Sequence, residues 1–342
     1  MRHGTAFSPL GAVLAGALLA GSAAGAGPAL ASGEGPGRTL SAVVGVHTVV
    51  PSDARTAETL GTERLGSGIV IDDKGLVLTI GYLMLEAERA EIIGADGKRL
   101  MATVVGYDHN SGLGLLRAAE PLAVKPARLG DSSTLAEGAK VLAVSFAGPQ
   151  PVVPAFIVSR RDFAGYWEYL LENAIFTSPP HRFHSGAGLF AEDGGLVGVG
   201  HLFVGNAAGP NSPMPGNMFV PIDALKPILA DLLERGRSAK PAHPWLGVYM
   251  GELKGRIFIA RVTPGGPAEK SGLKAGDVIV GVGGRRVRDV ADLLRKTWAQ
   301  GDAGVEVPLD ILRLEGSDDL NVRTFQVPTI DRQDWLKIKR GL

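Results

Sequence analysis

Residues 65–79 read Leu-Gly-Ser-Gly-Ile-Val-Ile-Asp-Asp-Lys-Gly-Leu-Val-Leu-Thr, two apolar runs that meet at an Asp-Lys-Gly turn. The stretch therefore predicts a β-hairpin with strands at 67–71 and 76–80. Short runs of the same kind recur along the first two thirds of the chain, at 42–50, 90–93, 101–107, 112–117, 140–146, 196–204 and 218–220. Strands this short and frequent, with no helices between them, favour antiparallel barrels or a sandwich over a parallel sheet.

The composition of the whole chain supports a β-rich protein of more than one domain. The 342 residues include 48 glycines and 22 prolines, with 45% hydrophobic residues, so there is enough apolar sequence for two cores. Thirty-five basic residues balance thirty-five acidic ones, which excludes a bulk charge that would attract nucleic acid or anionic lipid. The chain has no cysteine, which excludes disulfides, thiol catalysis and cysteine-ligated zinc.

The first 40 residues have the pattern of an export segment. Arg2 and His3 precede the apolar run at 10–20, and small residues then lead to Ala-Leu-Ala at 29–31. This order predicts a signal peptide at 1–31, followed by a flexible, glycine-rich leader at 32–40. The alternative is an uncleaved anchor, but the apolar run is well short of the roughly 20 residues that span a bilayer. A cysteine-free exported chain suits the bacterial periplasm.

One helix is predicted where the β-rich region ends. Asp223 can cap its start and Gly236 can end it, and its apolar stripe comprises Leu225, Ile228, Leu229, Leu232 and Leu233. The proline-containing segment that follows reads as a linker. The predicted organisation is a first domain at 41–236, a linker at 237–244, a second domain at 245–328 and a polar tail at 329–342.

The second domain carries the more distinctive motif. It opens with Trp-Leu-Gly-Val at 245–248 and continues as Pro-Gly-Gly-Pro-Ala-Glu-Lys-Ser-Gly-Leu-Lys-Ala-Gly-Asp-Val-Ile at 264–279. These residues resemble a PDZ domain of the bacterial type. The resemblance implies a helix at 290–298 beside a peptide groove, with Leu293 and Leu294 on its apolar side. It also implies strands at 255–262, 305–314 and 321–327.

In PDZ domains an exposed sheet edge accepts an extended peptide as an added strand. The resemblance places the backbone amides of Leu246, Gly247 and Val248 where a peptide's terminal carboxylate is held. Glycine at 247 lets the backbone approach that anion closely. The alternative is that Leu246 and Val248 are ordinary strand residues that pack a core.

The first domain resembles the trypsin-like domain of HtrA-type proteases. Residues 65–79 match its opening, and the segments 104–108, 129–132, 137–143, 185–189, 195–198 and 219–222 follow in the family's order. The resemblance extends over about 43–327. It implies a mainly β fold, with a chymotrypsin-like double β-barrel followed by a PDZ domain.

The catalytic triad of that family is incomplete in this sequence. Serine-protease hydrolysis needs a hydroxyl nucleophile, a histidine base and a carboxylate that orients the histidine. The resemblance places Ser185 at the nucleophile position, Tyr82 at the histidine position and Gly112 at the carboxylate position. A phenol with a pKa near 10 is ionised only to about 0.1% at neutral pH. The sequence therefore predicts a degenerate triad in which Ser185 is a remnant.

The oxyanion loop also departs from the family pattern. Phe183 stands where the family has a glycine whose amide helps to bind the oxyanion, so the loop of Phe183 and Ser185 is expected to be disturbed. Candidate replacement bases are His109, His181, His184 and His201, and each is predicted to be a surface histidine. No two of them have the spacing of a zinc motif, and no metal or cofactor is predicted.

Three functions remain open at this stage. The first is an exported HtrA-like protein that is proteolytically inactive and binds peptides, unfolded segments or protein C-termini through its PDZ domain, in quality control or as a scaffold. The second is an active serine endopeptidase that uses Ser185 with an unidentified base. The third is a partner subunit of an active homologue. The resemblance also raises a homotrimer, and no nucleic-acid partner or membrane span after signal cleavage is expected.

Overall fold

The computed structural model describes residues 41–313 and 321–338. The predicted signal peptide and leader at 1–40 lie outside the described residues. Within the described ranges, no helix is both long and apolar enough to cross a membrane. All described residues belong to one compact unit of the chain.

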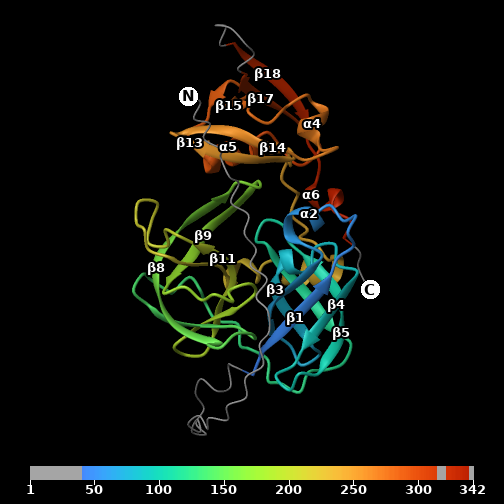
Figure 1. Ribbon diagram of the computed structural model, residues 1–342, viewed down its shortest axis with the longest axis vertical. Coiled ribbons are helices and arrows are strands. Elements are labelled where there is room, and N and C mark those ends of the chain that lie inside the picture. Colours follow the sequence, from blue (N-terminus) through green and yellow to red (C-terminus); the bar gives the residue numbers. More distant parts are fainter. Residues whose placement is uncertain (1–40, 314–320, 339–342) are drawn as a thin grey trace, which may run out of the picture. The chain divides into compact units, whose positions relative to one another are not determined.

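The first six strands close into an antiparallel barrel (Figure 1). They are β1 (Val43–Val49), β2 (Glu63–Val70), β3 (Leu76–Ile80), β4 (Arg89–Ile93), β5 (Arg99–Tyr107) and β6 (Leu113–Ala118), in the order β1-β2-β3-β6-β5-β4. The short helix α2 (Ala57–Leu60) precedes β2, and the 3-10 turn η1 (Gly81–Leu83) follows β3. Strands β2 and β3 form the predicted hairpin, with Ile69 opposite Leu78.

The next six strands close into a second barrel of the same kind. They are β7 (Lys140–Val144), β8 (Val152–Gly165), β9 (Tyr169–Ser178), β10 (Gly188–Ala191), β11 (Leu196–Val204) and β12 (Gly216–Pro221), in the order β10-β11-β12-β9-β8-β7. Closure leaves no open sheet edge in either barrel. The predicted mainly β double barrel is therefore confirmed.

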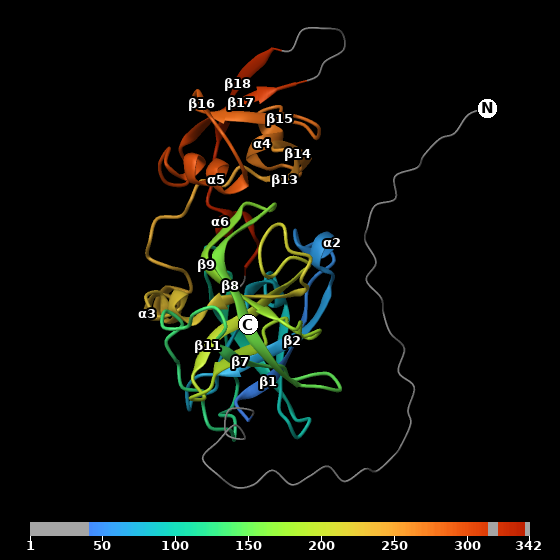
Figure 2. The ribbon, with the colours of Figure 1, turned by 90° about the vertical axis from the view of Figure 1, so that its left-hand side faces the viewer.

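Strands β8, β9 and β10 have no counterpart among the strands predicted from the sequence. Strands β8 and β9 form a long hairpin that extends beyond the barrel toward the second domain, as Figure 2 shows. In β8, Pro154 and the Arg160-Arg161 pair interrupt the apolar pattern. Strand β9 begins with Tyr-Leu-Leu-Glu-Asn, which has no strand alternation. The pairing of the two strands with each other and with their barrel neighbours outweighs these weak local signals.

The predicted helix is shorter than expected and starts later. A 3-10 turn, η2 (Ile222–Ala224), comes first, and α3 (Leu229–Arg235) ends at Gly236 with a left-handed backbone, φ 68°. Asp223 does not cap this helix; its carboxylate accepts a hydrogen bond of 2.6 Å from the Ser132 hydroxyl. The predicted apolar stripe is wrong at Leu233, which is 45% exposed.

The second domain is a curled sheet with two helices. Its main strands are β13 (Val248–Leu253), β14 (Arg256–Val262), β15 (Val278–Val282), β17 (Glu306–Leu312) and β18 (Val322–Pro328), hydrogen-bonded in that order, and β16 (Arg285–Arg286) pairs with β15. The helices are α4 (Pro267–Lys270) and α5 (Val290–Trp298). Helix α5 occupies the predicted residues, is capped by Asp289, and buries Leu293 and Leu294. Strand β13 lies at one edge of the sheet.

The residues after β18 pack against the rest of the chain, whereas the sequence analysis expected a separate tail. Helix α6 (Arg332–Trp335) is followed by Leu336, which is buried in a cluster with Leu85 and Tyr107 of the first barrel. The Lys337 amide donates to the Glu86 carboxylate at 3.0 Å. The segment 329–338 therefore connects the second domain back to the first.

Candidate functional site

Ser185 lies in the turn between β9 and β10, beside the first barrel. Its carbonyl accepts a hydrogen bond of 2.8 Å from the Ser67 amide, and the next residue, Gly186, donates its amide to the Gly200 carbonyl at 2.9 Å. These bonds fix the turn against both barrels. The side chain of Ser185 interacts with the phenol of Tyr82, which comes from η1.

The Tyr82 phenol is unsuited to act as a base. Its hydroxyl donates a hydrogen bond of 2.9 Å to the His201 carbonyl. Burial raises the pKa of Tyr82 above its ordinary value, and the interaction with Ser185 opposes this rise only in part. Tyr82 therefore stays protonated at neutral pH, with its proton directed away from the serine.

The surroundings of Gly112 leave little space for a side chain. Gly112 has φ +75°, and a Cβ at this position would lie 3.3 Å from the Tyr169 hydroxyl and 3.5 Å from Nε2 of His201. Tyr169 donates a hydrogen bond of 2.8 Å to the Ser111 carbonyl and stacks on His201, with ring centroids 5.3 Å apart. Trp167 packs against both rings, with its ring centroid 5.9 Å from that of Tyr169 and 6.4 Å from that of His201. Aromatic rings thus fill the region beside the glycine.

The Phe183 amide has an internal hydrogen-bond partner. It donates to Nδ1 of His181 at 3.2 Å. The His181 backbone is in turn held by Asn217, whose Oδ1 accepts from the His181 amide at 2.6 Å and whose Nδ2 donates to its carbonyl at 3.2 Å. An amide engaged in this way is not free to donate to an oxyanion at Ser185.

Two of the four candidate histidines are buried, so the prediction that all four lie at the surface is wrong. His181 is 2% exposed and His201 is 5% exposed. Burial, with a smaller effect of His184, lowers the pKa of His201 to about 3. Nδ1 of His201 and Nδ1 of His184 have no hydrogen-bond partner among the described residues. Within residues 41–313 and 321–338, no imidazole is hydrogen-bonded to Ser185.

The amides of Leu246, Gly247 and Val248 converge on one carboxylate. They donate hydrogen bonds of 2.8, 2.7 and 2.8 Å to the side chain of Glu168, from the turn between β8 and β9. Sequence analysis expected a peptide's terminal carboxylate here and gave no signal for Glu168. The side chains of Leu246 and Val248 are also buried in the core of the second domain. The alternative prediction, that these two residues pack a core, is therefore also correct.

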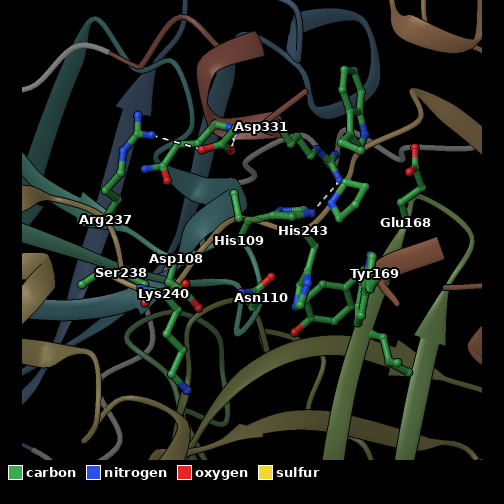
Figure 3. A pocket seen from close by; sticks show the side chains of 18 of the residues that line it. Asp108, His109, Asn110, Glu168, Tyr169, Arg237, Ser238, Lys240, His243 and Asp331 are labelled. Carbon is green, nitrogen blue, oxygen red and sulfur yellow. Dashed lines mark hydrogen bonds and ion pairs between the residues drawn. The ribbon is translucent and has the colours of Figure 1, made fainter. Parts of the chain in front are cut away.

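A cavity of about 420 Å³ lies beside Glu168 (Figure 3). In the close-up, Glu168 and Tyr169 lie on one side, and Arg237 and Asp331 lie across the cavity, joined by an ion pair of 3.1 Å. In the described ranges 41–313 and 321–338, no group of three or more His, Asp or Glu residues is placed to hold a metal ion.

Comparisons with known proteins match both halves of the chain. A model described as a trypsin-like peptidase domain matches residues 66–199, and one described as a PDZ domain matches 244–328. The chain is 28% identical over 279 residues to a probable periplasmic serine protease do/HhoA-like of Haemophilus influenzae. It is 30% identical over 269 residues to the periplasmic pH-dependent serine endoprotease DegQ of Escherichia coli. The alignments cover 76% and 73% of this chain, but only 58% and 57% of the two relatives.

Solved structures have the same fold. The HtrA-type protease AlgW with a decapeptide is 20% identical, with a TM-score of 0.51, over 86% of this chain and 96% of that one. The serine endoprotease from Yersinia pestis is 22% identical, also with a TM-score of 0.51, over 86% of this chain and 95% of that one. Identities this low support the fold and no finer conclusion.

Proposed function

The chain belongs to the HtrA family, in which a trypsin-like peptidase domain precedes a PDZ domain, and we propose that it is a peptide-binding member without proteolytic activity. The observation that carries the proposal is the environment of Ser185. Its side chain meets a protonated phenol whose own proton is donated to the His201 carbonyl. Loss of the triad histidine in a serine protease lowers kcat on the order of a millionfold.

Two further features support an inactive centre. Gly112 supplies no carboxylate to orient a base, and the space beside it is taken by Tyr169 and His201. The Phe183 amide donates to His181 and is unavailable to an oxyanion. Under this proposal Ser185, Tyr82 and Gly112 occupy the nucleophile, base and carboxylate positions without performing those roles.

The purified full chain tests this proposal directly. Casein degradation by the wild-type protein and by Ser185→Ala should be equal and at background, because no group activates the hydroxyl. Labelling of Ser185 by a fluorophosphonate probe should also be negligible. Casein turnover that disappears in Ser185→Ala would reject the proposal.

The second candidate function is an active serine endopeptidase that uses Ser185. It is favoured by the names of the relatives, which are serine proteases, and by the presence of the serine itself. Its base would have to be a group that is not hydrogen-bonded to Ser185 among the described residues. Serine-dependent casein turnover is the outcome that this candidate requires.

The retained activity in this proposal is peptide binding by the second domain. We propose the bounds expected from the sequence: a first domain at 41–236, a linker at 237–244 and a second domain at 245–328. Strand β13 lies at the edge of its sheet, and the amides at 246–248 converge on a carboxylate. An edge strand and a group of amides that bind a carboxylate are the two features by which a sheet captures a peptide C-terminus. We further propose a periplasmic location, since the relatives are named periplasmic and the N-terminal pattern is that of a signal peptide.

A further inference from the structure

The turn between β8 and β9 presents a glutamate in an unusual backbone conformation. Gly165 pairs with Tyr169, so the loop consists of Tyr166, Trp167 and Glu168. Three-residue hairpin loops of this kind end in a left-handed residue, which is usually glycine. Here Glu168 takes that position with φ +61°, although a left-handed backbone is unfavourable for a side chain of this size. A glutamate is retained where the turn itself favours glycine.

The Glu168 carboxylate is almost completely buried, with 4% of the residue exposed. Its Oε2 accepts from the Leu246 amide, and its Oε1 accepts from the amides of Gly247 and Val248. A buried carboxylate is costly unless it is hydrogen-bonded, and bonds from backbone amides to an ionised carboxylate are among the strong ones. The three amides thus form a site that fits a carboxylate.

The backbone of the turn also lies along the edge strand. The Tyr166 carbonyl accepts a hydrogen bond of 2.7 Å from the Met250 amide. Tyr166 is two residues before Glu168, and Met250 is two residues after Val248. The two contacts are therefore spaced by two residues on each segment, which is the spacing of an antiparallel strand pair. The turn therefore contacts β13 by both a carboxylate and a main-chain bond, as an added peptide strand would.

Contacts on either side hold the turn in this position. Leu170 is buried in the apolar core of the second domain, and Arg332 of α6 donates to the Trp167 carbonyl at 2.8 Å. Farther along β8, Asp162 forms an ion pair with Arg295 of α5. The seated turn is therefore supported at four points in addition to Glu168 itself, counting the Tyr166 bond.

We propose that residues 166–168 are an internal ligand of the peptide groove, in which Glu168 stands in for a peptide's terminal carboxylate and must leave before a peptide C-terminus can bind. This inference rests on the proposed peptide-binding function and adds its regulation. A groove that is open in only a fraction of molecules binds its ligand with an affinity reduced by that fraction. A groove that is closed in nine molecules of ten loses about tenfold in apparent affinity.

The test compares three variants of the full chain. Glu168→Gln replaces one acceptor oxygen with an amide nitrogen that cannot accept from the amides at 246–248. Glu168→Gly removes the carboxylate while suiting the backbone at φ +61°. Glu172→Gln is the matched control, because Glu172 lies in the same hairpin with its side chain 77% exposed. The first readout is amide hydrogen exchange at residues 246–248. The second is fluorescence titration with labelled peptides that end in an apolar residue, with a free or an amidated C-terminus.

Both Glu168 variants should exchange the amides at 246–248 faster than wild type and Glu172→Gln. Both should also bind the free-carboxylate peptides about tenfold more tightly than wild type, with no gain for the amidated peptides. Equal exchange and equal affinity in wild type and in both Glu168 variants would overturn the inference. Faster exchange with no peptide binding by any variant would support the internal ligand and reject the proposed peptide-binding function.

Discussion

Each backbone or side-chain group beside Ser185 that would take part in proteolysis is bound to another part of the protein. The Tyr82 hydroxyl donates to the His201 carbonyl, and the Phe183 amide donates to His181. The space next to Gly112 is filled by Tyr169 and His201. Because these contacts involve several residues, we expect that the proposed inactivity does not depend on any single substitution.

Restoring the missing side chains should therefore not restore proteolysis. In Tyr82→His with Gly112→Asp, the new aspartate would need φ +75° and would crowd the Tyr169 hydroxyl. We expect the double variant to show no casein turnover and to lose about 1–3 kcal/mol of stability through strain at residue 112. Casein assays and urea unfolding measure the two effects. The single variant Tyr82→His is the control, because it supplies the imidazole without strain at residue 112. Casein turnover by the double variant would contradict the expectation and show that the centre can still catalyse proteolysis.

The pH dependence of the groove is set by Glu168. Burial raises the pKa of Glu168 from 4.5 to about 7, and the amides at 246–248 together with Arg332 oppose this rise. The other ionisable groups near this carboxylate are His109, which donates toward its backbone, the phenol of Tyr169, and His243. The cavity beside it is also lined by Asp108, Arg235, Arg237, Lys240 and Asp331.

Peptide affinity should consequently rise with pH in the wild-type chain. The seated Glu168 holds a proton between pH 4.5 and about 7 that it releases when the turn leaves, so the seated state is fully favoured below pH 4.5 and is weakened as pH rises to about 7. Burial lowers the pKa values of His109 and His243 below the ordinary value. Because the pKa of Glu168 falls from about 7 to 4.5 when the turn leaves, titrations should show a gain on the order of a hundredfold in wild type across this window. An equal gain in Glu168→Gln would assign the effect to another group.

The sequence predicts the helices and strands whose bounds are set by local patterns of apolar, turn and capping residues. Strands β3 and β11 have the predicted bounds because their apolar runs end at clear turns, and α5 is identified by its cap and apolar face. The β8–β9 hairpin was missed because its residues carry no strand alternation, and it is stabilised by partners far along the chain. The groove could be located from its motif, but its occupant could not, since Glu168 and Gly247 meet only through the tertiary fold.

The contacts of the segment after β18, like those of the β8–β9 hairpin, could not be predicted from the sequence. Leu336 packs against Leu85 and Tyr107 and is 8% exposed, so Leu336→Ala should lower the free energy of unfolding by about 2 kcal/mol. The control is Leu233→Ala at a leucine that is 45% exposed, which should change it by less than about 0.5 kcal/mol. Urea unfolding of both variants measures the difference. Equal stability of Leu336→Ala and wild type would mean that the segment is not held at this site.

The N-terminal segment of the whole chain predicts export. The Ala-Leu-Ala sequence at 29–31 follows an apolar run of signal-peptide length, so the mature chain should begin near Ser32. N-terminal sequencing of the protein from a periplasmic extract of the native host tests this. Recovery of the intact N-terminus in the membrane fraction would instead support a retained anchor.

The β8–β9 turn also joins the peptide groove to the centre around Ser185. Glu168 occupies the groove, while the next residue, Tyr169, stacks on His201 and lies beside Gly112. A peptide that displaces Glu168 must therefore disturb the aromatic stack of Trp167, Tyr169 and His201. Because Glu168 and Tyr169 are adjacent in the chain, we expect a ligand at one site to alter the other.

Hydrogen exchange in two segments of the chain tests this expected coupling. On addition of a peptide with a free C-terminus, the amides at 246–248 should remain protected because the peptide replaces Glu168, whereas the turn at 163–171 should exchange several-fold faster. An amidated peptide, which lacks the carboxylate, should leave both segments as they are in the unliganded protein. Slower exchange of the turn on peptide binding would mean that the peptide docks beside a seated hairpin, and that the groove and the centre around Ser185 are not coupled by displacement.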